Sequence, residues 1–232
     1  KELSILIFLF SVLYLVNRYQ LGFSTNIIRS FIGGTIFISI LLLSFKNVWF
    51  LLLLFIPFYI HDMQTVIGLV LLVTSFFISF KYLKIILIVS IIFYFLGVTN
   101  ELIVNLLKLI VDEFGLNLSS LIVNEFSLTF NMKIQNFIYI IIPIAIILRN
   151  ISFDLYNSLE KNEQFFLKFL FTSISLVLLL LDATPRADRI MLFSLPFLYI
   201  FFIKFSTYKE KFFYINLVVI FNFIAIYRNL GN

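Results

Sequence analysis

Long apolar runs follow one another along almost the entire chain, and they constrain the fold more than any other feature of the sequence. Nine such segments can be delimited: 3–16, 27–45, 48–60, 64–80, 85–98, 136–148, 165–181, 185–203 and 212–227. Hydrophobic residues make up 62% of the 232 residues and charged residues only 12%, whereas soluble domains carry about 25% charged residues. One soluble core could not cover this much apolar surface, so we expect lipid to surround the segments.

The pattern within the runs distinguishes helices from membrane strands. In hydrocarbon every backbone polar group needs a partner within the protein, which leaves α-helices and closed barrels as spanning structures. Barrel strands alternate apolar and polar positions, and these runs do not. The sequence therefore predicts an all-α, polytopic integral membrane protein with about nine transmembrane helices in a single domain, 1–232. Several segments are shorter than the roughly 20 residues of a full span, so we expect their flanks to lie among headgroups or some helices to be re-entrant.

Two connections and the start of the chain depart from this pattern. Within 99–135, polar residues recur at helical spacing between apolar ones, which predicts an amphipathic helix in the plane of the interface, ended by Gly115; these residues are Glu101, Asn105, Lys108 and Asp112. Residues 149–164 are interpreted as a polar loop. The chain enters an apolar run directly after Lys1-Glu2, without the features of a signal peptide, so we expect upstream sequence in the intact protein.

The cations in the connections predict the orientation of the chain. With Lys1 on the cytoplasmic side, ten of the 17 Lys and Arg residues fall on the inner side and seven on the outer side, a positive-inside bias. Nine of the ten inner cations are Lys, whereas five of the seven outer ones are Arg. Because Arg binds phosphate and carboxylate in a bidentate geometry, we expect the outer face to carry the function.

Composition excludes several kinds of site and partner. Cysteine is absent and there is one histidine, so a metal centre built from Cys or a His cluster is excluded. No basic stripe or tail is present, so nucleic acid is not an expected partner. We expect neither a metal nor another cofactor.

The strongest candidate site is the segment 182–189. Thr184 followed by Pro185 is typical of a helix start, with Thr as the N-cap and Pro as the first helical residue. Arg186 and Arg189 are three residues apart and share a helix face, and the free N–H groups of a helix start attract anions. This pattern predicts a diphosphate site. The alternatives are that the arginines extend to lipid phosphates or pair with the two carboxylates of the segment, Asp182 and Asp188.

Two more helix starts on the predicted outer face carry polar groups. Arg29 follows Ser24-Thr25-Asn26, a stretch that can cap a helix. His61 has an unperturbed pKa near neutrality and is the natural general base, and Asp62 can cap the next helix, orient His61 or act as the base itself. The alternatives are an arginine that extends to the headgroups and a structural histidine. We expect the three helix starts to converge on one anionic ligand.

The order of these features resembles the EpsG-like branch of the Wzy-type polysaccharide polymerases, over roughly 20–75 and 180–205. In that family an Arg among small residues opens one helix, a His stands at the end of another, and an Arg precedes a late helix with a proline. The matching positions here are Arg29 before Gly33-Gly34, His61, and Arg186 and Arg189 ahead of Pro196. Ser30 stands where the family usually has Gln, and the family's early Arg-x-Gly-x-Asp-Tyr type segment is absent.

The resemblance implies polymerisation of oligosaccharide repeat units carried on undecaprenyl diphosphate, at the outer face of the bacterial inner membrane, in O-antigen, capsule or exopolysaccharide synthesis. The enzyme would be a metal-independent glycosyltransferase, with membrane lipid, a chain-length regulator and a flippase as further partners. His61, Asp62 and Arg189 would be catalytic. The substrate would be bound by five other residues: Arg29, Asp182, Thr184, Arg186 and Asp188.

Other functions remain open from the sequence. A flippase or transporter for a lipid-linked oligosaccharide also needs cations facing a polar cavity, but these are expected near the middle of helices. A membrane acyltransferase that modifies a surface glycan would use His61 as its base. An O-antigen ligase is closely related in chemistry and is poorly separated from a polymerase by sequence.

Overall fold

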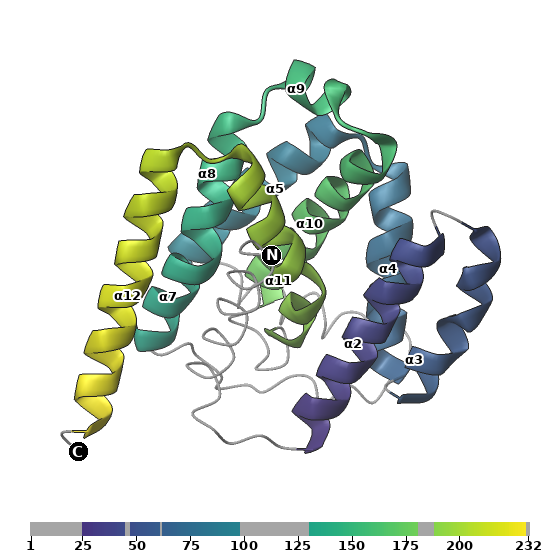
Figure 1. The fold of residues 1–232 in the computed structure, drawn as a ribbon, viewed down its shortest axis with the longest axis horizontal. Helices are drawn as coiled ribbons and strands as arrows, with labels where there is room; N and C mark the ends of the chain where they lie inside the picture. The colour runs from purple at the N-terminus through teal and green to yellow at the C-terminus, as the bar shows by residue number, and fades with distance from the viewer. Residues whose placement is uncertain (1–24, 45–46, 61, 98–129, 181–187, 231–232) are drawn as a thin grey trace. The chain divides into compact units, whose positions relative to one another are not determined.

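The structure, a computed structural model, describes residues 25–44, 47–60, 62–97, 130–180 and 188–230. All regular elements within these ranges are helices, which confirms the predicted all-α class (Figure 1). The predicted segment 3–16, and residues 99–129 with the predicted interfacial helix, lie outside the described residues. In chain order the elements are α2 (Thr25–Ser44), η1 (Val48–Leu54), α3 (Phe55–Ile60), α4 (Asp62–Phe77), α5 (Phe80–Leu96), α7 (Phe130–Asn136), η2 (Phe137–Ile141), α8 (Ile142–Asn150), α9 (Phe153–Ser158), α10 (Lys161–Leu180), α11 (Asp188–Phe205) and α12 (Tyr208–Leu230).

The chain separates into two compact units. Unit 1 comprises Lys1–Gly22, Thr129–Leu159 and Leu195–Asn232, and unit 2 comprises Phe23–Leu128 and Glu160–Ser194. Helix α11 contributes its first residues to unit 2 and the remainder to unit 1. The prediction that the chain folds as a single domain stays a prediction.

Two described helical stretches are long and apolar enough to cross a membrane, Lys133–Asn150 and Lys161–Leu180. They coincide with the predicted segments 136–148 and 165–181. Shorter apolar helices cover Ile32–Ser44, Val66–Phe77 and Ser194–Phe205. The structure thus supports membrane association, and the full count of nine spans stays a prediction.

Several helices of unit 2 bury hydroxyl groups and expose aliphatic side chains. Helix α5 buries Ser90 while it exposes Ile85, Ile88 and Ile92, and α4 buries Ser75. The buried hydroxyls bond to carbonyls of their own helix, at 2.8 Å from Ser90 to Ile86 and 2.6 Å from Ser75 to Leu71, so they need no water. Contiguous apolar outer faces are unusual on soluble monomers, and they suit contact with lipid.

In unit 2, α2 packs on η1, α3 and α4. Figure 1 shows that η1 and α3 run antiparallel to α2, and that α4 runs antiparallel to α3. Helices α2 and α4 consequently run in the same direction and begin at the same end of the unit (Figure 1). Gly68 permits their close approach, because a Cβ there would lie 3.0 Å from Cζ of the buried Phe37, and small residues have this role in membrane helix packing.

Helix α10 packs on α4 and α5 in unit 2 and runs antiparallel to α4. Near the end of α4, the Phe76 ring lies 4.7 Å from the Phe165 ring and the Phe76 carbonyl accepts from Lys168 Nζ at 3.2 Å. Because the first half of α10 meets the end of α4, the last residue of α10, Leu180, lies at the end where α4 begins.

Two predicted segments differ from the structure in local detail. The predicted loop 149–164 is wrong over most of its length, because α8 extends to Asn150, α9 covers Phe153–Ser158 and α10 begins at Lys161. Helix α9 forms because Ser152 Oγ accepts from the Leu155 N–H at 3.1 Å and Asp154 lies in the first turn, where a carboxylate stabilises the helix dipole. The predicted segment 48–60 is helical but begins as a 3-10 helix, η1, capped by the Asn47 side chain. Pro57 lacks an N–H and cannot donate to the carbonyl four residues earlier.

Candidate functional site

The predicted site residues divide between described and undescribed parts of the chain. Arg29 lies in the second turn of α2, and Asp62 is the first residue of α4. Asp188 and Arg189 are the first residues of α11 as described. The remaining four lie outside the described residues, and the predicted N-cap role of Thr184 stays a prediction; they are His61, Asp182, Thr184 and Arg186.

The structure brings three helix ends of unit 2 to one end of that unit. The starts of α2 and α4 lie there, and so does the end of α10 (Figure 1). Arg29 and Asp62 belong to the two starts, and Asp182 follows Leu180 by two residues in the sequence. Residues Asp188 to Ser194 of α11 also belong to unit 2. The starts of α2 and α4 thus lie together, whereas the third predicted start, at Thr184, lies outside the described residues, so the convergence of the three starts stays a prediction.

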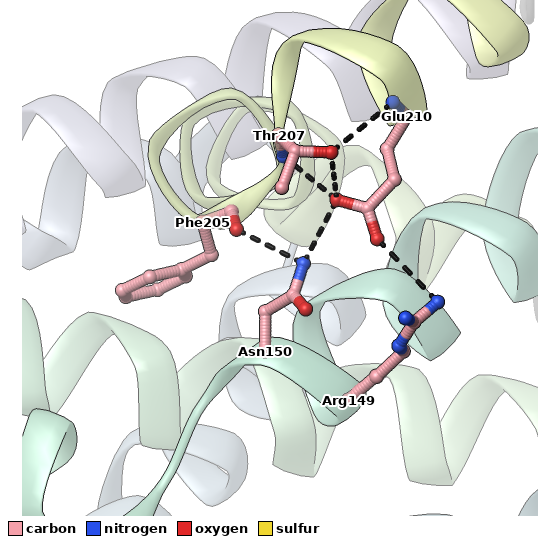
Figure 2. Close-up of polar contacts among 5 residues, drawn as sticks. All are labelled: Arg149, Asn150, Phe205, Thr207 and Glu210. Atoms are coloured by element: carbon pink, nitrogen blue, oxygen red, sulfur yellow. Dashed lines mark hydrogen bonds and ion pairs between the residues drawn. The ribbon is translucent and has the colours of Figure 1, made fainter.

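A polar cluster in unit 1 was not predicted from the sequence, and Figure 2 shows its five residues, which we call the turn cluster: Arg149, Asn150, Phe205, Thr207 and Glu210. Glu210 Oε2 accepts from the Thr207 N–H at 2.7 Å and from Thr207 Oγ1 at 2.9 Å. The Glu210 N–H donates back to Thr207 Oγ1 at 3.3 Å. This reciprocal pair is a capping box that begins α12, and its Thr-x-x-Glu spacing is a signal that the sequence does offer.

The turn cluster also joins the end of α8 to the turn between α11 and α12. Asn150 Nδ2 donates to the Phe205 carbonyl and to Glu210 Oε2, both at 3.0 Å. Arg149 Nη1 lies 3.8 Å from Glu210 Oε1, but the Arg149 side chain is 81% exposed and that of Glu210 only 17%. Exposed ion pairs contribute little, so the hydrogen bonds from Asn150 are the main connection.

The pKa of Glu210 is lowered from its usual value. The largest cause is the bond from the Thr207 N–H, followed among the lowering causes by the side chains of Thr207 and Asn150 and the charge of Arg149, while burial acts in the opposite direction. A carboxylate that accepts several hydrogen bonds is stabilised in its charged form. Glu210 is therefore a structural anion rather than a proton carrier near neutral pH.

A second cluster in unit 1 surrounds a π-helical turn, η2, in the stretch Lys133–Asn150. Pro143 has no N–H to donate to the carbonyl four residues earlier, that of Tyr139. Tyr199 Oη on α11 donates to this carbonyl at 3.3 Å, and Asn222 Nδ2 on α12 donates to Tyr139 Oη at 2.6 Å. Tyr139 and Tyr199 are fully buried. In hydrocarbon these side chains replace the water that would otherwise bond to the freed group, so the cluster holds the three helices together.

Replacing Tyr199 with Phe is expected to lower the free energy of unfolding by about 0.6–1.7 kcal/mol, the range for hydrogen bonds between membrane helices. Phe keeps the aromatic ring, so the loss of free energy of unfolding reports the hydrogen bond of the Tyr199 hydroxyl. Thermal unfolding of the purified protein in detergent checks this, with Tyr82→Phe on the exposed face of α5 as the matched control. Equal unfolding midpoints for Tyr199→Phe and the unaltered protein would contradict the assigned bond.

Neither described cluster has the groups of a hydrolytic or metal centre. Within the described residues, no set of three or more His, Asp or Glu side chains lies close enough to hold a metal ion. In comparisons with known proteins, no family model, no curated protein and no solved structure matches this chain. The candidate site therefore rests on the predicted residues of unit 2 and on the helix ends that carry them.

Proposed function

We propose that the chain belongs to a polysaccharide polymerase, a glycosyltransferase of the bacterial inner membrane. It crosses the membrane with about nine helices, and its active site faces the exterior or periplasm. It joins oligosaccharide repeat units carried on undecaprenyl diphosphate. The function accounts for a basic, apolar chain in which five of the six Arg residues are predicted to lie on one side of the membrane.

The observation that carries the proposal is the gathering of helix ends in unit 2. The starts of α2 and α4 and the end of α10 lie at one end of this unit. These ends carry Arg29 and Asp62 or lead directly into 182–189. A lipid-linked diphosphate lies at the membrane boundary, where the free N–H groups of the starts of α2 and α4, together with arginines, suit its charge.

The proposed reaction is displacement at the anomeric carbon of the donor. The acceptor hydroxyl oxygen forms the new glycosidic bond while the bond from the anomeric carbon to the diphosphate oxygen breaks. Undecaprenyl diphosphate leaves with the electron pair, and Arg186, Arg189 and Arg29 stabilise its developing charge. The hydroxyl proton passes to His61 or to Asp62. Asp182, Thr184 and Asp188 position the arginines and the start of α11.

Deletion of the gene, followed by complementation, tests this function through the surface glycan ladder on a gel. A polymerase predicts collapse to a single repeat unit and recovery with the intact gene. Loss of even the single unit would instead indicate a flippase, and a normal ladder lacking an acyl group would indicate an acyltransferase. Polymer that is made but not attached to its final lipid would indicate a ligase.

A further inference from the structure

The turn between α11 and α12 in unit 1 presents cations beside exposed aromatic rings. Lys209 is exposed and Lys211 half-buried, in the first turn of α12. Tyr208, Phe212 and Phe213 in the same stretch are 82%, 62% and 60% exposed. Tyr is enriched at the membrane–water interface, so Tyr208 suits that level, and the cations beside it then lie at the level of the headgroups.

The carboxylate within this stretch does not offset the cations at the surface. Glu210 is directed toward Thr207 and Asn150, and its side chain is 17% exposed (Figure 2). The Arg149 guanidinium beside it is largely exposed. Across 149–158 and 204–213 there are four cationic residues and two carboxylates, and Glu210 is one of those two. The surface of this end of unit 1 is therefore net positive.

The side chains along α12 follow the order of layers in one membrane leaflet. The first turn carries Lys209 and Lys211, and the next residues are Phe212 and Phe213. Further along, exposed aliphatic and aromatic residues include Val219, Ile220 and Phe223, and the exposed amide of Asn216 donates to a carbonyl of its own helix at 2.8 Å. This order corresponds to headgroup phosphate, interface and acyl chains. The same helix places its cations where they meet phosphate and its apolar face where it meets acyl chains.

We propose that this surface, defined by Arg149, Tyr208, Lys209, Lys211, Phe212 and Phe213, binds the headgroups of anionic phospholipids. Charge complementarity selects this occupant, because a zwitterionic headgroup offers no net charge to the lysines. The inference goes beyond the proposed polymerase activity and depends only on membrane association. The capping box and the Asn150 bonds keep the cations in one rigid arrangement.

Native mass spectrometry of the full-length protein in detergent tests the proposal. The protein is mixed with equal amounts of phosphatidylglycerol and phosphatidylcholine that have the same acyl chains. One juxtamembrane Lys contributes about five-fold, so we expect about 25-fold more phosphatidylglycerol than phosphatidylcholine bound through the two lysines. Lys209→Gln combined with Lys211→Gln should lower this ratio by about the same 25-fold factor.

Two controls separate a specific surface from general charge. Lys133→Gln removes an exposed lysine of α7 and should leave the ratio unchanged, whereas Lys209→Gln alone should lower it. Unchanged thermal unfolding confirms that these variants fold. Equal binding of the two lipids by the unaltered protein, or an unchanged ratio in the double variant, would overturn the proposal. A normal lipid preference in a protein that makes no polymer counts against the polymerase alone.

Discussion

Alanine at Arg186 or at Arg189 is expected to abolish long polysaccharide chains and to leave single capped repeat units. Each arginine is proposed to stabilise the negative charge that develops on the leaving diphosphate. Removal of one such donor lowers the rate of related group transfers by about 10²–10³-fold. The gel ladder of surface glycan, with the amount of protein in the membrane checked by immunoblot, measures this loss directly.

A matched arginine distinguishes a phosphate site from a general need for positive charge. Arg228 is on the same predicted outer side, in the last turn of α12, and is not one of the proposed site residues, so Arg228→Ala should keep the normal ladder. Arg189→Lys should retain part of the activity, because lysine keeps the charge but loses the bidentate geometry. If Arg186→Ala and Arg189→Ala both polymerise normally, the arginines do not bind the diphosphate.

Alanine at Glu210 is expected to produce the largest loss of stability among the described polar residues. It removes one member of the capping box of α12 and a partner of Asn150, with an expected loss of about 2 kcal/mol. For a chain of this size that loss corresponds to a fall of about 4–8 °C in the unfolding midpoint. Thermal unfolding in detergent measures it, with Asp154→Ala at an exposed position of α9 as the control.

Glu210 also predicts how stability depends on pH. Because its pKa in the folded protein is lowered, its contribution is fully present above the unfolded value of about 4.3 and is lost as the pH falls through the folded pKa. The difference in free energy of unfolding between the unaltered protein and Glu210→Gln should therefore become smaller as the pH falls below about 4.3. A difference in free energy of unfolding that stays constant from pH 7 to pH 3 would contradict this role of Glu210. The role of the turn cluster would also be contradicted if Glu210→Ala and Asp154→Ala unfolded at the same temperature.

The class of the fold was predictable because only helices and closed barrels satisfy all backbone hydrogen bonds within lipid. The runs at 136–148 and 165–181 predicted helices, and 136–148 and 165–180 lie within described helices that are long enough to cross a membrane. The short helix α9 was missed because its polar residues resemble a loop, although Ser152 and Asp154 are a helix-start signal. The π turn at Phe137–Ile141 depends on Pro143 and on a partner from another helix, so no local pattern predicts it.

Contacts between residues far apart in the sequence are the part of the polar clusters that could not be predicted. The Thr-x-x-Glu capping box could have been found from spacing alone, but Asn150 and Glu210 are 60 residues apart and nothing in either segment predicts the other. The same holds for Tyr199 and the Tyr139 carbonyl. For the proposed active site, sequence predicted helix starts at Arg29 and Asp62, and packing of α10 on α4 places those starts with the end of α10.

Reconstitution of the intact protein in vesicles tests the central claim most directly. A purified undecaprenyl-diphosphate-linked repeat unit is supplied as both donor and acceptor, with no nucleotide sugar and with a chelator present. The polymerase account predicts a ladder of lipid-linked oligomers and one undecaprenyl diphosphate released for each bond formed, with neither product from the Arg189→Ala variant. A repeat unit that remains unchanged beside folded protein, or that only crosses the bilayer, would contradict the account.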